Sequence, residues 1–404
     1  ANTGEAITFT SQVSRATPTT LKNLDGFYIY ADAQGYTNMF LSGKKVTKEG
    51  AEDSNIYVLD EKVTWPSDVD KISFWGYGPL DANTYLKPEI SAQSQNLNNF
   101  KVAASWQTGG KDQKDFVVTF AEAEKKPGNQ VPLEFHHALS QIELKAKIGA
   151  NPETGRRVYI KGAWFVNINS AGDLRFKSDA AAEYHHMNWT GQDMPTYYGC
   201  YLGTRASLSS SESTTIIGDV GGVNTSLMLI PQEVNKYVFP SANVLNDDLA
   251  LASDQKPGAY ILVLCRIETH HNTAVTDDGQ AKNPAIKPDP DNQGHTHQLY
   301  PIIKDSEGNP IYKDEAYGYV CVPVDINWVP GRKYVYTLEF CGRGSGAGQY
   351  APTDIPDVLP NDDNNVNNPD ADGKKPGDYV LDNEISFSVT VSAWTEVPVE
   401  NKMH

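Results

Sequence analysis

The stretch Ile385-Ser-Phe-Ser-Val-Thr-Val-Ser-Ala-Trp394 alternates apolar with small polar residues without a break. Side chains of an extended chain point alternately to its two faces, so this alternation is typical of a β-strand with one buried face. The sequence therefore predicts a strand over residues 385–394. Its apolar face carries Ile385, Phe387, Val389 and Val391.

A shorter segment of the same kind, Ala6-Ile-Thr-Phe-Thr10, lies near the opposite end, with Ile7 and Phe9 on its apolar face. A basic turn with Arg15 and Pro18 follows it. Strands at both ends of a chain, each beside a polar segment, favour exchange of strands between molecules, and so assembly over catalysis. Because proteases cut exposed turns of this kind, Arg15 is a candidate processing site. On sequence alone, an ordinary surface arginine is the preferred interpretation of Arg15.

The chain between these ends has the pattern of short strands separated by Gly, Pro, Asn and Asp. Strands at intervals of about ten residues are typical of β-sandwiches, so we expect an all-β fold. The segment Lys125–Asn129 is the best candidate linker, which predicts an N-terminal domain over residues 1–130 and a C-terminal domain over residues 131–404. Further strands are expected at 24–31, 55–59, 70–77, 116–120, 142–148, 157–168, 173–177, 226–231, 259–269, 317–326 and 333–341.

Two segments, residues 272–296 and 342–383, are rich in Asp, Asn, Gly and Pro. We expect both to be solvated loops, because they offer too little apolar surface to offset the entropy lost on ordering. A loop as long as the second usually serves a function or acts as a tether. The second loop would then be the tether of the strand at 385–394.

The same two segments contain partial calcium-binding patterns. Asp289-x-Asp291-x-Gln293-Gly294 and Asn368-x-Asp370-x-Asp372-Gly373 match the opening of an EF-hand loop. Position twelve, which supplies a bidentate glutamate in that motif, is Tyr300 in the first segment and Tyr379 in the second. Solvated loops are therefore preferred over specific calcium sites.

The composition limits the partners. The chain has 404 residues and a formal net charge of −17, from 34 Lys and Arg against 51 Asp and Glu. Such a chain repels nucleic acid and anionic membrane surfaces, and no apolar run reaches the roughly 18 residues of a membrane span. The polar start, Ala1–Glu5, is expected to be a processed end. The 4 cysteines lack the spacing of a zinc site, and Cys265, in phase with Ile261 and Val263, is expected to be a buried free thiol.

The sequence contains few patterns that are typical of catalysis. The sequence contains no nucleophile elbow, zinc-protease motif, phosphate-binding loop or dinucleotide-binding motif, so neither an enzymatic activity nor a cofactor is expected. A glycosidase stays open, because its two carboxylates can lie anywhere in the sequence. Of the histidine pairs His136–His137, His185–His186 and His270–His271, each offers at most one side chain to a given face of a strand. His295 and His297 would share a face, but polar edge residues are preferred over metal ligands for all of these.

Several segments, taken in order, carry a resemblance that spans nearly the whole chain. They are Ile7-Thr-Phe9 with Arg15-Ala-Thr and Phe27-Tyr-Ile-Tyr-Ala, Trp65-Pro with Ile72-Ser-Phe-Trp-Gly-Tyr, Leu133-Glu-Phe-His-His-Ala-Leu-Ser-Gln-Ile, Leu227-Met-Leu-Ile-Pro-Gln232, Trp328-Val-Pro-Gly-Arg-Lys-Tyr-Val-Tyr-Thr-Leu338 and the segment 385–394. No single segment is specific, but the ordered set resembles the fimbrillin family, the subunits and tip or accessory proteins of type V pili in Bacteroidales.

The resemblance implies two transthyretin-like (Greek-key) β-sandwich domains in an exported cell-surface lipoprotein, held to the outer membrane only through a lipid attached upstream of Ala1. It also implies assembly with other fimbrial subunits, into a homo- or hetero-polymer, by donor-strand exchange. A protease would cut after Arg15 and release an N-terminal plug strand that contains Ile7 and Phe9. A neighbour's strand would then fill the groove, with these candidate inserting residues: Ile385, Phe387, Val389 and Val391.

Two functions from different classes follow from the sequence. The first is a fimbrial subunit or a tip or accessory adhesin with a host or bacterial surface receptor; the long loop at 342–383 departs from compact stalk pilins and leaves its position in the fimbrium open. The alternative is a surface glycan-binding lipoprotein. Trp75, Trp106, Trp189 and Trp328 could stack on sugars, although core packing is the preferred role of such aromatics. A terminal strand seated between two sheet edges would favour assembly, and coplanar exposed aromatics beside carboxylates would favour glycan binding.

Overall fold

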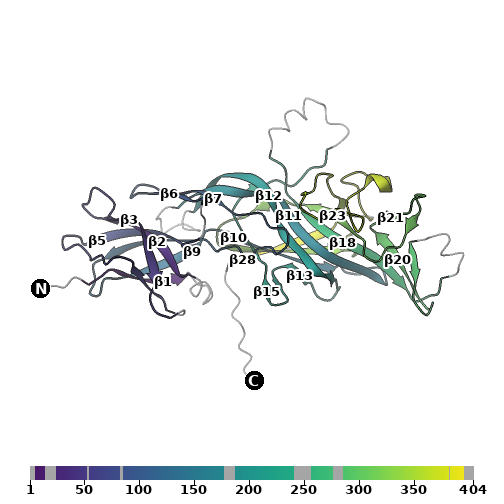
Figure 1. The fold of residues 1–404 in the computed structure, drawn as a ribbon, viewed down its shortest axis with the longest axis horizontal. Helices are drawn as coiled ribbons and strands as arrows, with labels where there is room; N and C mark the ends of the chain where they lie inside the picture. The colour runs from purple at the N-terminus through teal and green to yellow at the C-terminus, as the bar shows by residue number, and fades with distance from the viewer. Residues whose placement is uncertain are drawn as a thin grey trace, which may run out of the picture.

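The computed structural model describes residues 5–13, 24–51, 54–81, 85–176, 187–240, 256–275, 285–381 and 383–394. Within these ranges the chain forms strands and one short 3-10 turn, η2 (Asp370–Asp372), without an α-helix. The prediction of an all-β fold is therefore confirmed. Figure 1 shows an elongated molecule with β1 near one end and β20 and β21 near the other. In the described part, no helix has the length and apolar character that crossing a membrane requires.

The first sheet closes on itself. Its strands, in spatial order, are β1 (Thr8–Val13), β4 (Ile56–Leu59), β3 (Leu41–Lys48), β2 (Gly26–Ala33), β5 (Lys71–Gly78), β8 (Val117–Glu124) and β9 (Gln130–His137), and β9 returns to β1. Inside lies an apolar core that includes Phe9, Phe27, Phe74 and Phe135. Closure leaves this sheet without a free edge, because β1 pairs with a neighbour on each side.

The largest sheet has 10 strands and runs along the rest of the molecule. It contains β19 (Ile286–Pro288), β20 (His295–Tyr300), β18 (Tyr260–His271), β11 (Arg156–Arg175), β7 (Gln95–Lys101) and β6 (Lys87–Ile90), with β12 (Asn188–Ser207) beside β11, and β23 (Tyr317–Pro323), β26 (Gln349–Tyr350) and β27 (Asn365–Val366) beside β18. The strands expected at 157–168 and 173–177 are one strand, β11. Strand β12 was not expected, because most of its side chains are exposed or half-buried and do not alternate.

A 5-stranded sheet packs against one face of the largest sheet. It contains β13 (Thr214–Ile217), β10 (Ser140–Ile148), β25 (Arg332–Phe340) and β28 (Ser386–Ala393), with β16 (Leu227–Leu229) beside β10. The two sheets share one core, in which Phe165 of β11 meets Tyr336 of β25 with ring centroids 5.1 Å apart. The remaining ladders are β14 (Asp219–Val220) with β15 (Val223–Asn224), β17 (Glu233–Val234) with β24 (Ile326–Asn327), and β21 (Ile303–Lys304) with β22 (Pro310–Ile311).

The chain crosses between these two regions more than once. Strands β6 and β7 lie in sequence between β5 and β8 of the first sheet, yet they pair within the largest sheet. At the junction Phe100 of β7 stacks on Phe116 at 4.5 Å and meets Trp189 of β12 at 5.5 Å. Strand β9, which covers residues 130–137, continues the first sheet beyond the expected linker. The division of the chain into two domains at residue 130 stays a prediction.

The segment 342–383 differs from the expected solvated tether. Its residues Ala351, Ile355 and Leu359 are buried and form a third apolar core with the outer face of the largest sheet, including Leu262 and Tyr319. This is why β18 is buried on both faces. The prediction that the segment cannot bury apolar surface is wrong, because a few well-spaced apolar side chains suffice when an apolar sheet face lies beneath them.

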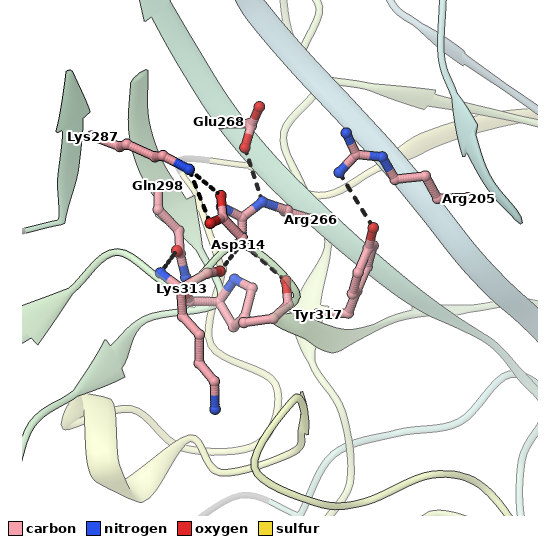
Figure 2. A network of polar contacts seen from close by, with 10 residues as sticks. Arg205, Arg266, Glu268, Lys287, Gln298, Lys313, Asp314 and Tyr317 are labelled. Atoms are coloured by element: carbon pink, nitrogen blue, oxygen red, sulfur yellow. Dashed lines mark hydrogen bonds and ion pairs between the residues drawn. The ribbon is translucent and has the colours of Figure 1, made fainter. Parts of the chain in front are cut away.

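A buried ion pair in β18 holds the turn that precedes β23 (Figure 2). Arg266 of β18 is fully buried, and its Nε donates to the Glu268 carboxylate at 2.9 Å. Its Nη1 donates to the backbone carbonyls of Lys313 and Ala316, at 2.7 and 3.1 Å. Lys313 in turn donates its backbone N–H to the side-chain oxygen of Gln298 in β20, at 2.7 Å. These contacts fix the turn before β23 against β18 and β20.

We expect Arg266→Met to lower the free energy of unfolding by about 3–5 kcal/mol, because it leaves the Glu268 carboxylate buried without its partner. The double variant Arg266→Met/Glu268→Leu should recover much of this loss, since it removes both charges together. Urea unfolding followed by tryptophan fluorescence measures both. A double variant as unstable as the single one would contradict this account.

Candidate functional site: the terminal strands

Strand β1 is inserted between two other strands of the first sheet. It pairs antiparallel with β4, where Phe9 lies opposite Tyr57, and parallel with β9 along its whole length, from Thr8 opposite Gln130 to Val13 opposite Phe135. Strand β1 thus has a paired neighbour on each side. Its removal would open the closed sheet between β4 and β9.

The apolar side chains of this segment enter the first core. Ile7 and Phe9 are both buried, and the Phe9 ring meets Phe27 and Phe74 edge-on, at centroid distances of 6.0 and 5.5 Å. The backbone N–H of Ile7 also donates to the carbonyl of Val63 at 2.8 Å. The segment therefore fills a defined apolar slot. Arg15, the candidate processing residue, lies outside the described residues.

Strand β28 lies at the free edge of the 5-stranded sheet. It pairs antiparallel with β25 over its 8 residues, from Glu339 opposite Ser386 to Arg332 opposite Ala393. In the described part, β25 is the one strand with which β28 makes extended contact. No side chain of β28 is buried. It is held to the protein mainly by its backbone ladder.

The exposed apolar face of β28 points toward the core side of its sheet. Directly opposed residues of paired strands place their side chains on one face, and Phe387, Val389 and Val391 lie opposite Leu338, Tyr336 and Tyr334, which are all buried. The three side chains on β28 nevertheless remain exposed, by 40%, 39% and 53% respectively. We call Phe387, Val389 and Val391 the apolar shelf. The expectation that this face is buried is wrong for these three side chains, because no strand among the described residues covers them.

The two residues that flank β28 behave differently. Ile385 is buried in the main core, and Trp394 stacks on the His137 ring with centroids 4.1 Å apart. The His137 Nδ1 lies 2.7 Å from a carboxylate oxygen of Asp115. The backbone N–H of Trp394 donates to the carbonyl of Gly331 at 2.9 Å. The strand is anchored at its ends and uncovered along its middle.

The tryptophans offer little surface for sugars. Trp75, Trp189 and Trp328 are buried, in agreement with the preferred core role. Trp106 is half-buried and lines a cleft of about 410 Å³ together with Phe100, Gln107 and Met228. The indole N–H of Trp164 donates to the Trp106 carbonyl at 2.8 Å, which fixes the backbone of this segment. The cleft offers one partly exposed indole rather than a coplanar platform.

The histidines and the acidic loops contain the candidate metal ligands. Within the described residues, one group of three or more candidate ligands converges: His271, His295 and His297. Burial, together with the neighbouring His295 and His271, lowers the pKa of His297. In the acidic loops, the Asp289 carboxylate lies 2.9 Å from the His270 Nε2, and Asp372 accepts a hydrogen bond from the Tyr350 hydroxyl at 3.1 Å. His185 and His186 lie outside the described residues.

The cysteines have no reactive setting. All four are free, and Cys200, Cys265 and Cys321 are buried, which confirms the expectation for Cys265. Desolvation raises the pKa of Cys265 well above its usual value and that of Cys341 to about 11. These thiols therefore remain protonated at neutral pH, and a protonated thiol is a poor nucleophile.

Comparisons with known proteins agree with this architecture. A family model described as fimbrillin-like matches residues 14–257. Among solved structures, a fimbrial protein from Bacteroides vulgatus superposes with a TM-score of 0.53 at 14% identity, over 97% of this chain and 100% of that chain. It shares the fold. A "putative cell adhesion protein" from Parabacteroides distasonis gives a TM-score of 0.46 at 10% identity, with 98% of each chain covered. No curated protein matches the chain.

Loose attachment of β28 predicts a difference in hydrogen exchange. The amide hydrogens of residues 386–393 should exchange faster than those of β10, because few buried contacts oppose the local opening of β28. Hydrogen–deuterium exchange with mass spectrometry measures both segments in one experiment, and β10, at the centre of the same sheet, is the internal control. Equal protection of the two strands would contradict loose attachment.

Proposed function

Because the chain belongs to the fimbrillin-like family, we propose that it is a fimbrial subunit that polymerises by exchanging its terminal strands. Membership of this family makes it a structural protein of the cell surface and not an enzyme. The observation that carries the proposal is the contrast between two strands. Phe9 of β1 and the adjacent Ile7 are buried where β1 lies between two strand edges, whereas β28 leaves its apolar shelf exposed.

In this proposal, loss of β1 creates the acceptor site. The facing edges of β4 and β9 would lose their hydrogen-bonding partner, and the rings of Phe27 and Phe74 would lose the contact with Phe9. Unpaired edges above an apolar groove are a strong template for strand addition. Full burial of side chains such as Ile7 and Phe9 stabilises the bound strand by about 1.5–3 kcal/mol each, so β1 does not leave spontaneously from the intact chain. We therefore propose that its release requires cleavage after Arg15.

Strand β28 has the pattern that this groove would accept. Ile7 and Phe9 are two positions apart, and Ile385, Phe387, Val389 and Val391 repeat that spacing over a longer strand. In the groove β28 would pair with two strands, β4 and β9, in place of its single neighbour β25. Its half-exposed apolar side chains would become buried. Both changes favour transfer to a neighbouring subunit, provided that β1 has left.

The same proposal covers the partners and the location. Other copies of this chain or related subunits would supply and accept strands, and a lipid attached upstream of Ala1 would hold the precursor in the outer membrane.

The packed segment 342–383 adds a layer outside the two sandwich layers. This supports a tip or accessory position, where added surface could meet a receptor. Incorporation of labelled fatty acid into the full-length precursor tests the anchor, and labelling that survives replacement of every upstream cysteine would oppose it.

Glycan binding remains the alternative from another class. The one specific observation in its favour is the cleft beside Trp106, which Gln107 and Asp112 also line. Binding of sugars there would be changed by Trp106→Ala and left unchanged by substitutions in β28. Fluorescence titration with a panel of surface glycans separates the two functions, since strand exchange predicts no dependence on Trp106.

Charging the apolar shelf should block polymerisation. After limited digestion with trypsin, we expect the wild-type chain to form oligomers that survive dilution, as measured by size-exclusion chromatography with light scattering. Phe387→Asp should abolish them, because a carboxylate cannot enter an apolar groove without a large desolvation penalty. Arg15→Ala should stay uncut at that position and monomeric.

The matched control is Ser388→Asp, which adds the same charge to the opposite face of the same strand. Both Phe387 and Ser388 are exposed in the monomer, so each variant should change the free energy of unfolding by less than about 0.5 kcal/mol. Polymerisation of cleaved Phe387→Asp at the wild-type rate would refute strand exchange through β28. So would a cleaved wild-type chain that stays monomeric at high concentration.

A reversible lock provides an independent test. Thr337 of β25 and Ser388 of β28 are register partners, and opposed residues of antiparallel strands lie about 4.5–5.5 Å apart, within the span of a disulfide. The oxidised double variant Thr337→Cys/Ser388→Cys should therefore remain monomeric after cleavage, and dithiothreitol should restore polymerisation. Oxidised protein that polymerises with an intact disulfide would show that β28 does not need to leave β25.

A further inference from the structure

Three histidines converge where β18 ends and β20 begins. His271 is the last residue of β18 and lies opposite His295, the first residue of β20, while His297 is two positions further along β20. One nitrogen of each ring lies within 4.8 Å of the others. The ring centroids are 4.8 to 5.1 Å apart. The strand register thus brings His271 beside two histidines that are more than twenty residues away in sequence.

One ring is held in a fixed orientation. The Nδ1 of His295 lies 2.6 Å from the carbonyl oxygen of Thr273. A carbonyl can only accept a hydrogen bond, so Nδ1 carries the proton and Nε2 of the neutral ring keeps its lone pair. A backbone carbonyl behind a histidine is the usual way in which proteins orient a metal-binding imidazole. His295 is also buried, so the orientation does not depend on solvent.

The lone pair of His295 points at another imidazole nitrogen. Its Nε2 is 2.9 Å from the Nε2 of His297. Two nitrogens bound to one tetrahedral zinc ion at its usual bond length lie about 3.3 Å apart, so a small rotation of either ring would admit a cation between them. The exposed ring of His271 closes the third side. Three imidazoles around one point form a typical set of ligands for Zn²⁺, Cu²⁺ or Ni²⁺.

The neighbouring histidine does not belong to this group. Adjacent residues of a strand point to opposite faces, so His270 faces away from His271. There its Nε2 lies 2.9 Å from the Asp289 carboxylate. His270 is therefore already paired with an acidic side chain, and it provides a matched control on the same strand.

We propose that His271, His295 and His297 form a binding site for one transition-metal dication, of which Zn²⁺ is the representative probe. The ion would cross-link the end of β18 to the start of β20, at the end of the molecule away from β1 (Figure 1). Three protein ligands leave a fourth position of a tetrahedral ion for water or for a side chain from outside. The site is independent of strand exchange, since neither β1 nor β28 contributes to it.

The test uses the full chain without a polyhistidine tag. Isothermal titration with ZnCl₂ should give one site per chain, and Co²⁺ should produce the visible absorption bands of a tetrahedral or five-coordinate complex. His271→Gln and His297→Gln should each weaken Zn²⁺ binding by at least about tenfold, the least that loss of a direct ligand is expected to cause. Both leave the contact of His295 with Thr273 intact, and circular dichroism checks that they fold.

His270→Gln should bind Zn²⁺ as tightly as the wild-type chain. At one Zn²⁺ concentration, Zn²⁺ should also raise the Tm of the wild-type and His270→Gln chains more than that of His297→Gln, because stabilisation by a ligand falls as its affinity for the folded state falls. Absence of saturable Zn²⁺ binding, or equal loss in the His270→Gln control and in His297→Gln, would overturn the proposal. Polymerisation after trypsin cleavage should be the same in all these variants, which separates failure of this site from failure of strand exchange.

Discussion

Pairing of β1 with both β4 and β9 is the constraint on which the first half of the structure depends. Backbone N–H and C=O groups buried without partners are costly, and a strand in the middle of a sheet satisfies them on both sides. Here that strand is β1, and every other strand of the first sheet follows it in sequence, so closure of the sheet relies on one short segment. A single cut after it would separate this strand from the rest of the chain. The stability of the closed sheet and the opportunity to open it therefore reside in the same few residues.

In the second half of the structure, an irregular segment is buried and a regular strand is exposed. The outer face of the largest sheet is covered by residues 351–359, although these belong to a segment with no regular strand of its own along that stretch. In the 5-stranded sheet, the core-side face of β28 is uncovered, although its residues have a regular strand pattern. The chain therefore can bury an apolar sheet face even with a segment that forms no strand. The exposed shelf is thus a specific feature of β28, and it is consistent with a strand that finds its cover in another molecule.

Much of the fold could be predicted from the sequence, and the failures have physical causes. Strong alternation located β25 and β10, and an apolar run located β18. Strand β12 was missed because it is held by its ladder with β11 while most of its side chains meet solvent, so nothing in its composition marks it. For residues 385–394 alternation predicted the strand correctly but not its burial. Alternation tells which face needs a cover, and it cannot tell whether the same chain provides one.

The histidine cluster illustrates the same limit at the level of a site. The sequence placed His295 and His297 on one face, because a strand has a period of two, and it separated His270 from His271 for the same reason. Which strand lies beside β20, and in which register, depends on the pairing of β18 across an intervening loop, and local pattern carries no information on that pairing. A shift of the register by one residue would place His270, with its Asp289 partner, on the face of His295 instead of His271. The convergence of three rings is therefore a product of the global topology, and the same is true of the slot that β4 and β9 form around β1. In both cases the residues that matter were visible in the sequence, but the structure alone shows what they face.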